Sequence, residues 1–325
     1  MKKHFKKLLL MALMAVMAVG LIACGTDKSD NESTKEEKTS VTITSLDASK
    51  NEIELEVPYN PKRIAILDLA SLDIIDELGV GDRVVGMAST SIDYLEKYSN
   101  DASIKNLGTI KEADLEAVME CEPDIIFIGG RLSKSYDALS EIAPVVYLAT
   151  DTNEGLVNSV SKNAKTIASI FGMEDKVDSL MSDFGARIDT IKKISSGKTA
   201  LVGMTTSGSF NLLGNDGRCS LIGVEAGFNN LTAAGSTSTH GNESSFETVV
   251  QQNPDYIFVM DRDSAISTAG AKTAKEIVEN ELVKTTDAYK NNHIIYLEHS
   301  NVWYTAEGGI QALDIMLKDL EKGLK

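Results

Sequence analysis

Short apolar runs in this chain alternate with longer segments whose apolar residues recur at the spacing of a helix. Apolar runs typical of buried strands occupy residues 64–67, 84–87, 144–148, 199–204 and 294–297. The helical spacing appears at residues 68–79, 156–171, 219–227, 273–280 and 310–320. Residues 41–57 instead alternate apolar and polar side chains, which predicts a leading hairpin. A chain in which strands and helices alternate favours an α/β fold with mainly parallel sheets.

Two segments of the sequence repeat each other 131 positions apart. Residues 115–131 and 246–262 share Glu, Val, Pro, Asp, Ile, Phe and Arg in register, and they end in Arg131 and Arg262. Each copy predicts a short helix, a Pro-Asp turn and an apolar strand, so we expect two similar lobes. Ligands bind at the carboxyl ends of strands in open α/β sheets. The repeat therefore predicts two facing lobes, each with one arginine directed into a common cleft for an anion.

Residues 155–196, midway between the repeats, carry helix signals without a strand signal. Residues 174–195 form one apolar stripe of about 22 residues, which predicts a helix roughly 33 Å long at the standard rise. We interpret this segment as a rigid bridge between the lobes. The expected domains are then an N-terminal lobe at residues 41–173, a linker helix at 174–196 and a C-terminal lobe at 197–325.

The first 23 residues have the pattern of an export signal. Four lysines precede an apolar run at residues 8–23, and residues 21–24 match the bacterial lipobox. We expect cleavage before Cys24 and a lipid on its sulfur, which would anchor the protein on the outer face of the cytoplasmic membrane. Residues 24–40 have hardly an apolar side chain and are expected to form a flexible tether. An ordinary signal peptide and an uncut anchor helix are the alternatives.

The composition is that of a globular protein with a negative surface. Of 325 residues, 42% are hydrophobic and 25% are charged, and the formal charge is −16. Removal of residues 1–23, which contain four lysines and no acid, takes this charge to −20. Nucleic acid is then a poor partner, and any anion site must be a local basic cluster. Cys121 and Cys219 are expected to be free core thiols rather than a disulfide.

Three arginines form the candidate ligand site. Arg131 and Arg262 end the repeats, and Arg218 follows a stretch rich in glycine and asparagine at residues 207–217. A guanidinium stays charged and offers a planar fork to paired oxygens. Three such cations facing one cleft would require a multiply charged anion. The alternative is that each arginine makes a surface ion pair that contributes little.

Three further residues of the second lobe carry weaker signals. His240 lies in a polar loop at residues 232–245, where it either binds a metal or an anion or is simply solvated. Trp303 and Tyr304 are expected in a loop before the last helix. They either form an aromatic wall for a flat ligand or pack the core beneath the loop.

Two glutamates occupy the same place in the two repeats. Glu116 and Glu247 are expected in the first turns of the repeat helices. They either form docking points for a two-fold symmetric partner or merely favour the start of each helix. The sequence contains no GxSxG, HExxH, P-loop or GxGxxG motif, and its histidines show no obvious metal-site spacing. We therefore expect no enzyme.

Several motifs, taken together, resemble those of lipid-anchored substrate-binding proteins of siderophore ABC importers. They are the lipobox, residues 61–68, 108–116, 123–131 and 140–144, and the pair Trp303-Tyr304. Within this class the chain is most similar to the branch that binds ferric catecholate siderophores of the petrobactin and enterobactin-fragment type. The resemblance covers the whole chain. It implies the class III periplasmic-binding-protein fold, in which a single long helix joins two lobes.

The resemblance also implies roles for particular residues. It assigns ligand binding to Arg131, Arg218 and Arg262, possible iron coordination to His240, and the place of a partner tyrosine to Tyr304. It assigns permease docking to the glutamates at positions 116 and 247. The chain departs from the family at Cys219, where a phenylalanine is common, and this leaves the shape of the ligand open.

The implied function is capture of an anionic ferric siderophore and its delivery to an ABC permease for iron uptake. The protein would act as a monomer without an intrinsic cofactor. Two alternatives stay open at this point. One keeps the fold but binds haem, a corrinoid or another anionic chelate, and the other is a surface adhesion lipoprotein without a small ligand.

Overall fold

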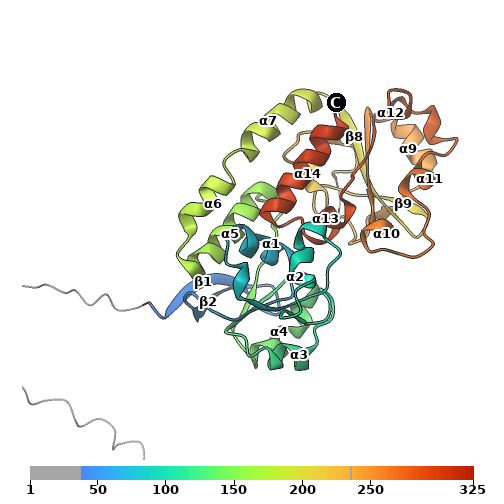
Figure 1. The fold of residues 1–325 in the computed structure, drawn as a ribbon. Helices are drawn as coiled ribbons and strands as arrows, with labels where there is room; N and C mark the ends of the chain where they lie inside the picture. Colours follow the sequence, from blue (N-terminus) through green and yellow to red (C-terminus); the bar gives the residue numbers. More distant parts are fainter. Residues whose placement is uncertain (1–37, 235) are drawn as a thin grey trace, which may run out of the picture. The chain divides into compact units, whose positions relative to one another are not determined.

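The first half of the protein is built on a parallel sheet (Figure 1). The computed structural model describes residues 38–234 and 236–325, so the expected signal segment and Cys24 lie outside the described residues. An antiparallel hairpin of β1 (Ser40–Leu46) and β2 (Glu52–Pro58) comes first. Five parallel strands follow in the order β5-β4-β3-β6-β7. They are β3 (Ile64–Ile66), β4 (Val84–Met87), β5 (Lys105–Asn106), β6 (Ile125–Ile128) and β7 (Val145–Tyr147).

The second half has a mixed sheet with a parallel centre. Its strands are β8 (Thr199–Thr206), β9 (Ser209–Leu212), β10 (Asn229–Asn230), β11 (Asn242–Glu243), β12 (Tyr256–Asp261) and β13 (Ile294–Tyr296). The order is β11-β9-β8-β12-β13 with β10 beside β8, and only the pairs that involve β9 are antiparallel. The sequence did not predict β9. It is joined to β8 by a two-residue turn, since Ser207 and Gly208 have φ values of 50° and 82°.

Helices cover both faces of each sheet. The first half contains α1 (Leu69–Glu77), α2 (Glu96–Ser99), α3 (Leu115–Glu120), α4 (Tyr136–Ser140) and α5 (Leu156–Phe171). The connection is formed by α6 (Glu174–Leu180) and α7 (Phe184–Ser195). The second half contains α8 (Ser220–Gly223), α9 (Phe246–Gln252), α10 (Arg262–Ala265), α11 (Ala274–Val278), α12 (Asp287–Lys290), α13 (Ser300–Thr305) and α14 (Ile310–Gly323). None of the helices in the described ranges has both the length and the apolar character needed to span a bilayer.

Successive residues of a strand alternate between two cores. One core is shared by both halves, and the other lies within a single half. On β6, Phe127 lies in a core that continues through both halves and the connecting helices, whereas Ile126 lies in a second core of the first half. On β12, Phe258 lies in the shared core and Ile257 in a third core of the second half. All four side chains are completely buried. Both sheets are therefore covered on two faces, as parallel strands require.

The aspartate of each Pro-Asp turn ties two neighbouring strands together. Asp124 precedes β6, and its carboxylate accepts hydrogen bonds from the backbone N–H groups of Lys62 and Arg63, just before β3. Asp255 precedes β12 and accepts from the N–H and the hydroxyl of Thr199, the first residue of β8. The repeated dipeptide thus fixes equivalent strand starts in the two halves.

The single helix expected over residues 174–195 is interrupted, which corrects the prediction. The structure has two consecutive helices, α6 and α7, separated by a turn at residues 181–183 (Figure 1). The turn carries Ser182, whose hydroxyl donates to the carbonyl of Ser179, and Asp183. Short polar side chains of this kind compete with helical hydrogen bonds and favour turns. The buried face predicted by the apolar stripe is confirmed, because Val177, Phe184 and Ile188 all lie in the shared core.

The two halves cap each other's helices. The N-caps of α5 and α14 are Gly155 and Gly309, which have no side chain to accept from the first turn. Glu225 of the second half accepts from the N–H of Val157 in α5 at 3.1 Å. Asp73 of the first half accepts from two N–H groups of α14. A Cβ atom at Gly309 would overlap the Asp73 carboxylate, so glycine makes room for the carboxylate that replaces its cap.

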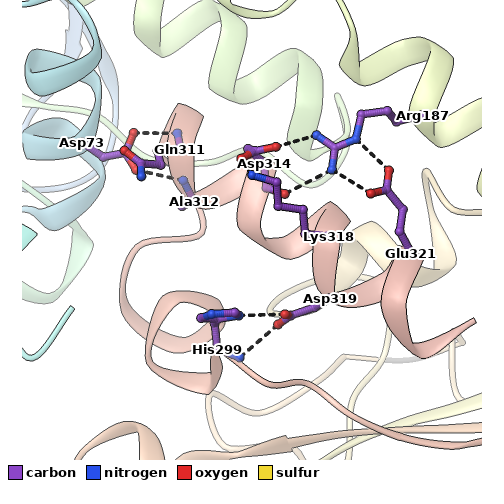
Figure 2. Close-up of polar contacts among 9 residues, drawn as sticks. All are labelled: Asp73, Arg187, His299, Gln311, Ala312, Asp314, Lys318, Asp319 and Glu321. Carbon is purple, nitrogen blue, oxygen red and sulfur yellow. Dashed lines mark hydrogen bonds and ion pairs between the residues drawn. The ribbon is translucent and has the colours of Figure 1, made fainter. Parts of the chain in front are cut away.

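Helix α14 also contacts the connecting segment (Figure 2). Arg187 of α7 donates to Asp314 at 2.6 Å and to Glu321 at 2.7 Å, both on α14. Because the side chain of Arg187 is only 17% exposed, these ion pairs are shielded from solvent. The last helix therefore contacts the first half, the connection and its own half.

Candidate functional site

Arg131 and Arg262 lie at equivalent strand ends, as the repeat predicted. Arg131 follows β6 after two glycines, and Arg262 follows β12 directly as the first residue of α10. The first glycine, Gly129, allows close approach, because a Cβ atom there would overlap the carboxylate of Asp68. Both strands lie inside their sheets rather than at an edge. The sheet geometry thus presents one guanidinium from each half.

Arg218 is held by the polar loop of the second half. Its Nη1 donates to the carbonyl of Thr239 at 2.8 Å. The following residue, Cys219, has a φ of 62° and a buried side chain. Cys121 and Cys219 are both free and buried, which confirms that interpretation of the cysteines.

All three arginines converge on Tyr304. The carbonyl of Tyr304 accepts from Arg131 Nη2 at 2.9 Å and from Arg218 Nε at 3.4 Å. Its hydroxyl accepts from Arg262 Nε at 3.2 Å. The Cζ atoms of Arg131, Arg218 and Arg262 lie 5.6, 4.5 and 5.6 Å from the centre of the tyrosine ring. One aromatic residue therefore holds three cations together by its ring, its carbonyl and its hydroxyl.

The cluster borders a cleft of about 440 Å³ between the two halves. Arg131, Arg218, Tyr304, Asp68 and Glu307 are among the lining residues. Arg262 contacts Tyr304 but is not among the residues that line the cleft. Within the described residues, Arg131 and Arg218 form no ion pair with a carboxylate, whereas Arg262 pairs with Asp263 at 3.3 Å. Two guanidinium groups are thus left for a ligand.

The pKa values of Arg131 and Tyr304 reflect the closely spaced positive charges of the three arginines. Burial lowers the pKa of Arg131, and the neighbouring Arg218 lowers it further. Burial alone would raise the pKa of the Tyr304 hydroxyl, but the hydrogen bond from Arg262 and the charges of the three arginines outweigh it, so that pKa is lowered. An anion entering the cleft would relieve this repulsion.

His240 lies close enough to the cluster to experience its charge. Its ring is exposed, and its pKa is lowered by partial burial and by Arg262, Arg218, Lys111 and Arg131. The neutral imidazole, which is the form that can bind a metal, is therefore favoured. His240 does not line the cleft within the described residues.

Trp303 does not form a wall of the cleft, so the ligand-binding interpretation of this residue is wrong and core packing is confirmed. The pair Trp303-Tyr304 lies in α13 rather than in a loop. The indole of Trp303 is completely buried in the shared core, and its Nε1 donates to Asp319 at 2.9 Å. Its role is structural.

Glu116 and Glu247 occupy matching places on two similar helices. Each lies in the first turn, of α3 and α9, after an N-cap whose side chain accepts from the backbone. Both side chains are exposed. The repeat therefore displays one acid on the surface of each half.

Two residues of the cleft were missed by sequence reasoning. Asp68 caps α1 by accepting from the N–H of Ser71 at 2.9 Å. Glu307 lies in the short loop between α13 and α14, and burial raises its pKa to about 7. The only local signal was an acid before Gly308 and Gly309, which no motif marks as functional.

Among the described residues, one group has the composition of a metal site. Glu298, His299 and Asp319 offer ligand atoms within 4.8 Å of one another. Asp319 already accepts from His299 Nδ1 at 2.7 Å and from the His299 N–H (Figure 2). It also accepts from the Trp303 indole. Glu298 pairs with Lys322 at 2.6 Å. Because the carboxylates already have these partners, we interpret the three residues as structural contacts that hold α13 in place.

Comparison with known proteins identifies the fold family. The model of the periplasmic binding protein family matches residues 64–300. The chain belongs to the periplasmic binding protein family. The petrobactin-binding protein YclQ of Bacillus subtilis is 36% identical over 98% of this chain and 99% of its own length. The ferric-anguibactin-binding protein FatB of Vibrio anguillarum is 26% identical over 82% of this chain and 84% of its own length.

Solved structures agree with this membership in the periplasmic binding protein family. The crystal structure of YclQ superimposes with a TM-score of 0.81 and covers 88% of this chain and 99% of its own. The catecholate-siderophore binding protein VctP of Vibrio cholerae has 30% identity and a TM-score of 0.78, over 87% of this chain and all of its own. These relatives are all named as binding proteins, for petrobactin, ferric anguibactin and catecholate siderophores. The expected class of fold is thereby confirmed.

Proposed function

We propose that this protein captures an anionic ferric siderophore of the catecholate type and delivers it to an ABC permease for iron uptake. The observation that carries the proposal is the convergence of Arg131, Arg218 and Arg262 on Tyr304 beside a cleft of about 440 Å³. A ferric catecholate complex is large and multiply negative. Such a ligand offers several oxygens to guanidinium groups that already repel one another.

The names of similar proteins support this class of ligand. YclQ is named for petrobactin, FatB for ferric anguibactin and VctP for catecholate siderophores. Petrobactin is accordingly the first candidate ligand. His240 would add a neutral nitrogen to the iron, and the protein itself would hold no permanent cofactor.

The same proposal covers membrane attachment and the permease. Lipidation of Cys24 would hold a monomer at the outer face of the cytoplasmic membrane. Two relatives are named as lipoproteins. Glu116 and Glu247, exposed on helices of the two halves, would then contact basic pockets of the permease. Residues 41–173 and 197–325 would act as two lobes around the cleft.

The test is a binding titration with ferric petrobactin, followed by the fluorescence of Trp303, the sole tryptophan. Ferric petrobactin should quench this emission with a dissociation constant in the micromolar range or below. Arg131→Ala and Arg218→Ala should each weaken binding roughly tenfold to a hundredfold, the effect of losing one charged hydrogen bond. Arg83→Ala removes the same charge outside the cleft and should bind as the unchanged protein does.

Two outcomes would contradict the proposal. Absence of saturable quenching by ferric petrobactin and by other ferric catecholates would exclude this ligand class. Equal affinity of the arginine variants and the unchanged protein would exclude the arginine site. Haem and a corrinoid belong in the same titration, because tighter binding of either would redirect the function within this fold.

A further inference from the structure

Glu307 is an acid placed against a basic cluster in the wall of the cleft. It lies in the loop between α13 and α14, three residues after Tyr304, and it lines the same cleft as Arg131 and Arg218. The positive charges of both arginines lower the pKa of Glu307, and Arg218 has the stronger effect. The backbone N–H of Cys219, the residue that follows Arg218, also lowers the pKa of Glu307.

A second acid, Glu225, also influences Glu307. Glu225 acts on it with repulsive charge, and the Glu225 Oε2 atom is buried without a partner in the described part of the chain. Ser220 lines the cleft, and within the same described part its buried hydroxyl also has no partner. A proton on Glu307 would remove its charge repulsion with Glu225.

We propose that Glu307 sets the charge of the ligand site: as a carboxylate it balances Arg131 and Arg218 in the empty cleft, and it takes one proton from solvent when an anion binds. The inference rests on the proposed function, since it requires an anionic ligand at the arginines. The step converts a carboxylate into a carboxylic acid and involves no other reactant. The site thereby changes its charge by one unit and accepts a more highly charged anion.

The charges around Glu307 explain why binding would cause proton uptake. Burial raises its pKa to about 7, while Arg218 and Arg131 hold it down. A bound anion neutralises these arginines and adds its own repulsion, so the pKa of Glu307 rises further. Below the pKa of the empty protein Glu307 is protonated in both states. Above it, affinity should fall as the pH rises, by up to about tenfold for each pH unit.

The test compares the unchanged protein with Glu307→Gln, which keeps the size and an acceptor oxygen of the side chain but cannot ionise. Affinity for ferric petrobactin is measured from pH 6 to pH 8.5, and calorimetry in HEPES and in Tris gives the protons taken up per ligand. Glu307→Gln should match the unchanged protein near pH 6 and bind about tenfold more tightly near pH 8. It should also lose the proton uptake.

The comparison isolates Glu307 from other titrations. Asp68, Tyr304 and His240 also face the arginines, and the siderophore titrates itself, but these groups are the same in both proteins. Glu281→Gln removes the same charge from an exposed site away from the cleft and should follow the unchanged protein. Parallel affinity curves with equal proton uptake would overturn the inference while leaving the proposed function intact. Absence of binding by the unchanged protein would overturn both.

Discussion

Replacement of Asp73 by alanine is expected to weaken the contact between the two halves. The buried carboxylate accepts from the N–H of Gln311 at 3.0 Å, from the N–H of Ala312 at 2.9 Å and from the Tyr94 hydroxyl at 2.6 Å. Alanine leaves these donors without their acceptor. Loss of a helix cap costs about 1 kcal/mol, and loss of a hydrogen bond to a charged group costs about 2 kcal/mol. We therefore expect a loss of about 3 kcal/mol near neutral pH.

The loss should be larger in mild acid. Burial raises the pKa of Asp73 to about 6, against the hydrogen bonds that lower it. A carboxyl whose pKa is higher in the folded protein than in the unfolded chain stabilises the folded state most below its unfolded pKa. This contribution disappears as the pH rises from 3.8 to about 6. The effect of Asp73→Ala should therefore be about 2 kcal/mol greater at pH 4.5 than at pH 7.5.

Thermal unfolding followed by circular dichroism would measure both effects. A loss of about 3 kcal/mol corresponds to a drop in Tm of roughly 5 °C for a protein of this size. Asp82→Ala, which removes an exposed acid from the same half without a cap, is the control and should leave Tm unchanged. If Asp73→Ala unfolds within about 1 °C of the unchanged protein, the cross-half cap does not contribute and the reasoning is wrong.

Three further changes test other contacts. Glu225→Ala removes the matching cap of α5, a single hydrogen bond, and should lower stability by about 1 kcal/mol in urea unfolding. Tyr304→Phe keeps the aromatic ring beside the arginines and should weaken siderophore binding less than Tyr304→Leu does. Equal affinities of these two variants would show that the ring does not support the arginines. Arg187→Met removes the ion pairs to Asp314 and Glu321 and should destabilise the protein by about 1–2 kcal/mol. Because these pairs are shielded from solvent, the loss should change little in high salt.

Local patterns sufficed for the repeated elements because each rests on neighbours in sequence. The helices α3 and α9 have side-chain N-caps, Asp114 and Ser245, and the strands β6 and β12 are continuous apolar runs. Such elements follow from capping and burial alone. The strand β9 could not be predicted in this way. Its register depends on pairing with β8 and on a positive φ at Ser207, and a polar stretch of sequence indicates neither.

The interruption of the linker shows what an apolar stripe leaves undecided. The stripe over residues 174–195 was correct about the buried face, because that face meets the shared core. The stripe does not predict whether the backbone hydrogen bonds of the helix continue from α6 to α7. Those bonds depend on the polar side of the segment, where Ser182 bonds to the carbonyl of Ser179. Hydrophobic spacing predicts which side chains are buried, whereas continuity of a helix also depends on its exposed residues.

The same distinction explains why the arginines were predictable and their support was not. Arg131 and Arg262 are fixed by strand ends, which the repeat reveals. The place of Tyr304 follows from α13, which the sequence suggested to be a loop. Successive residues of a helix point about 100° apart, so Trp303 and Tyr304 are directed differently. Trp303 bonds to Asp319 inside the core, and the tyrosine ring is thereby directed to the three guanidinium groups. The aromatic pair thus links the packing of the second half to the geometry of its ligand site.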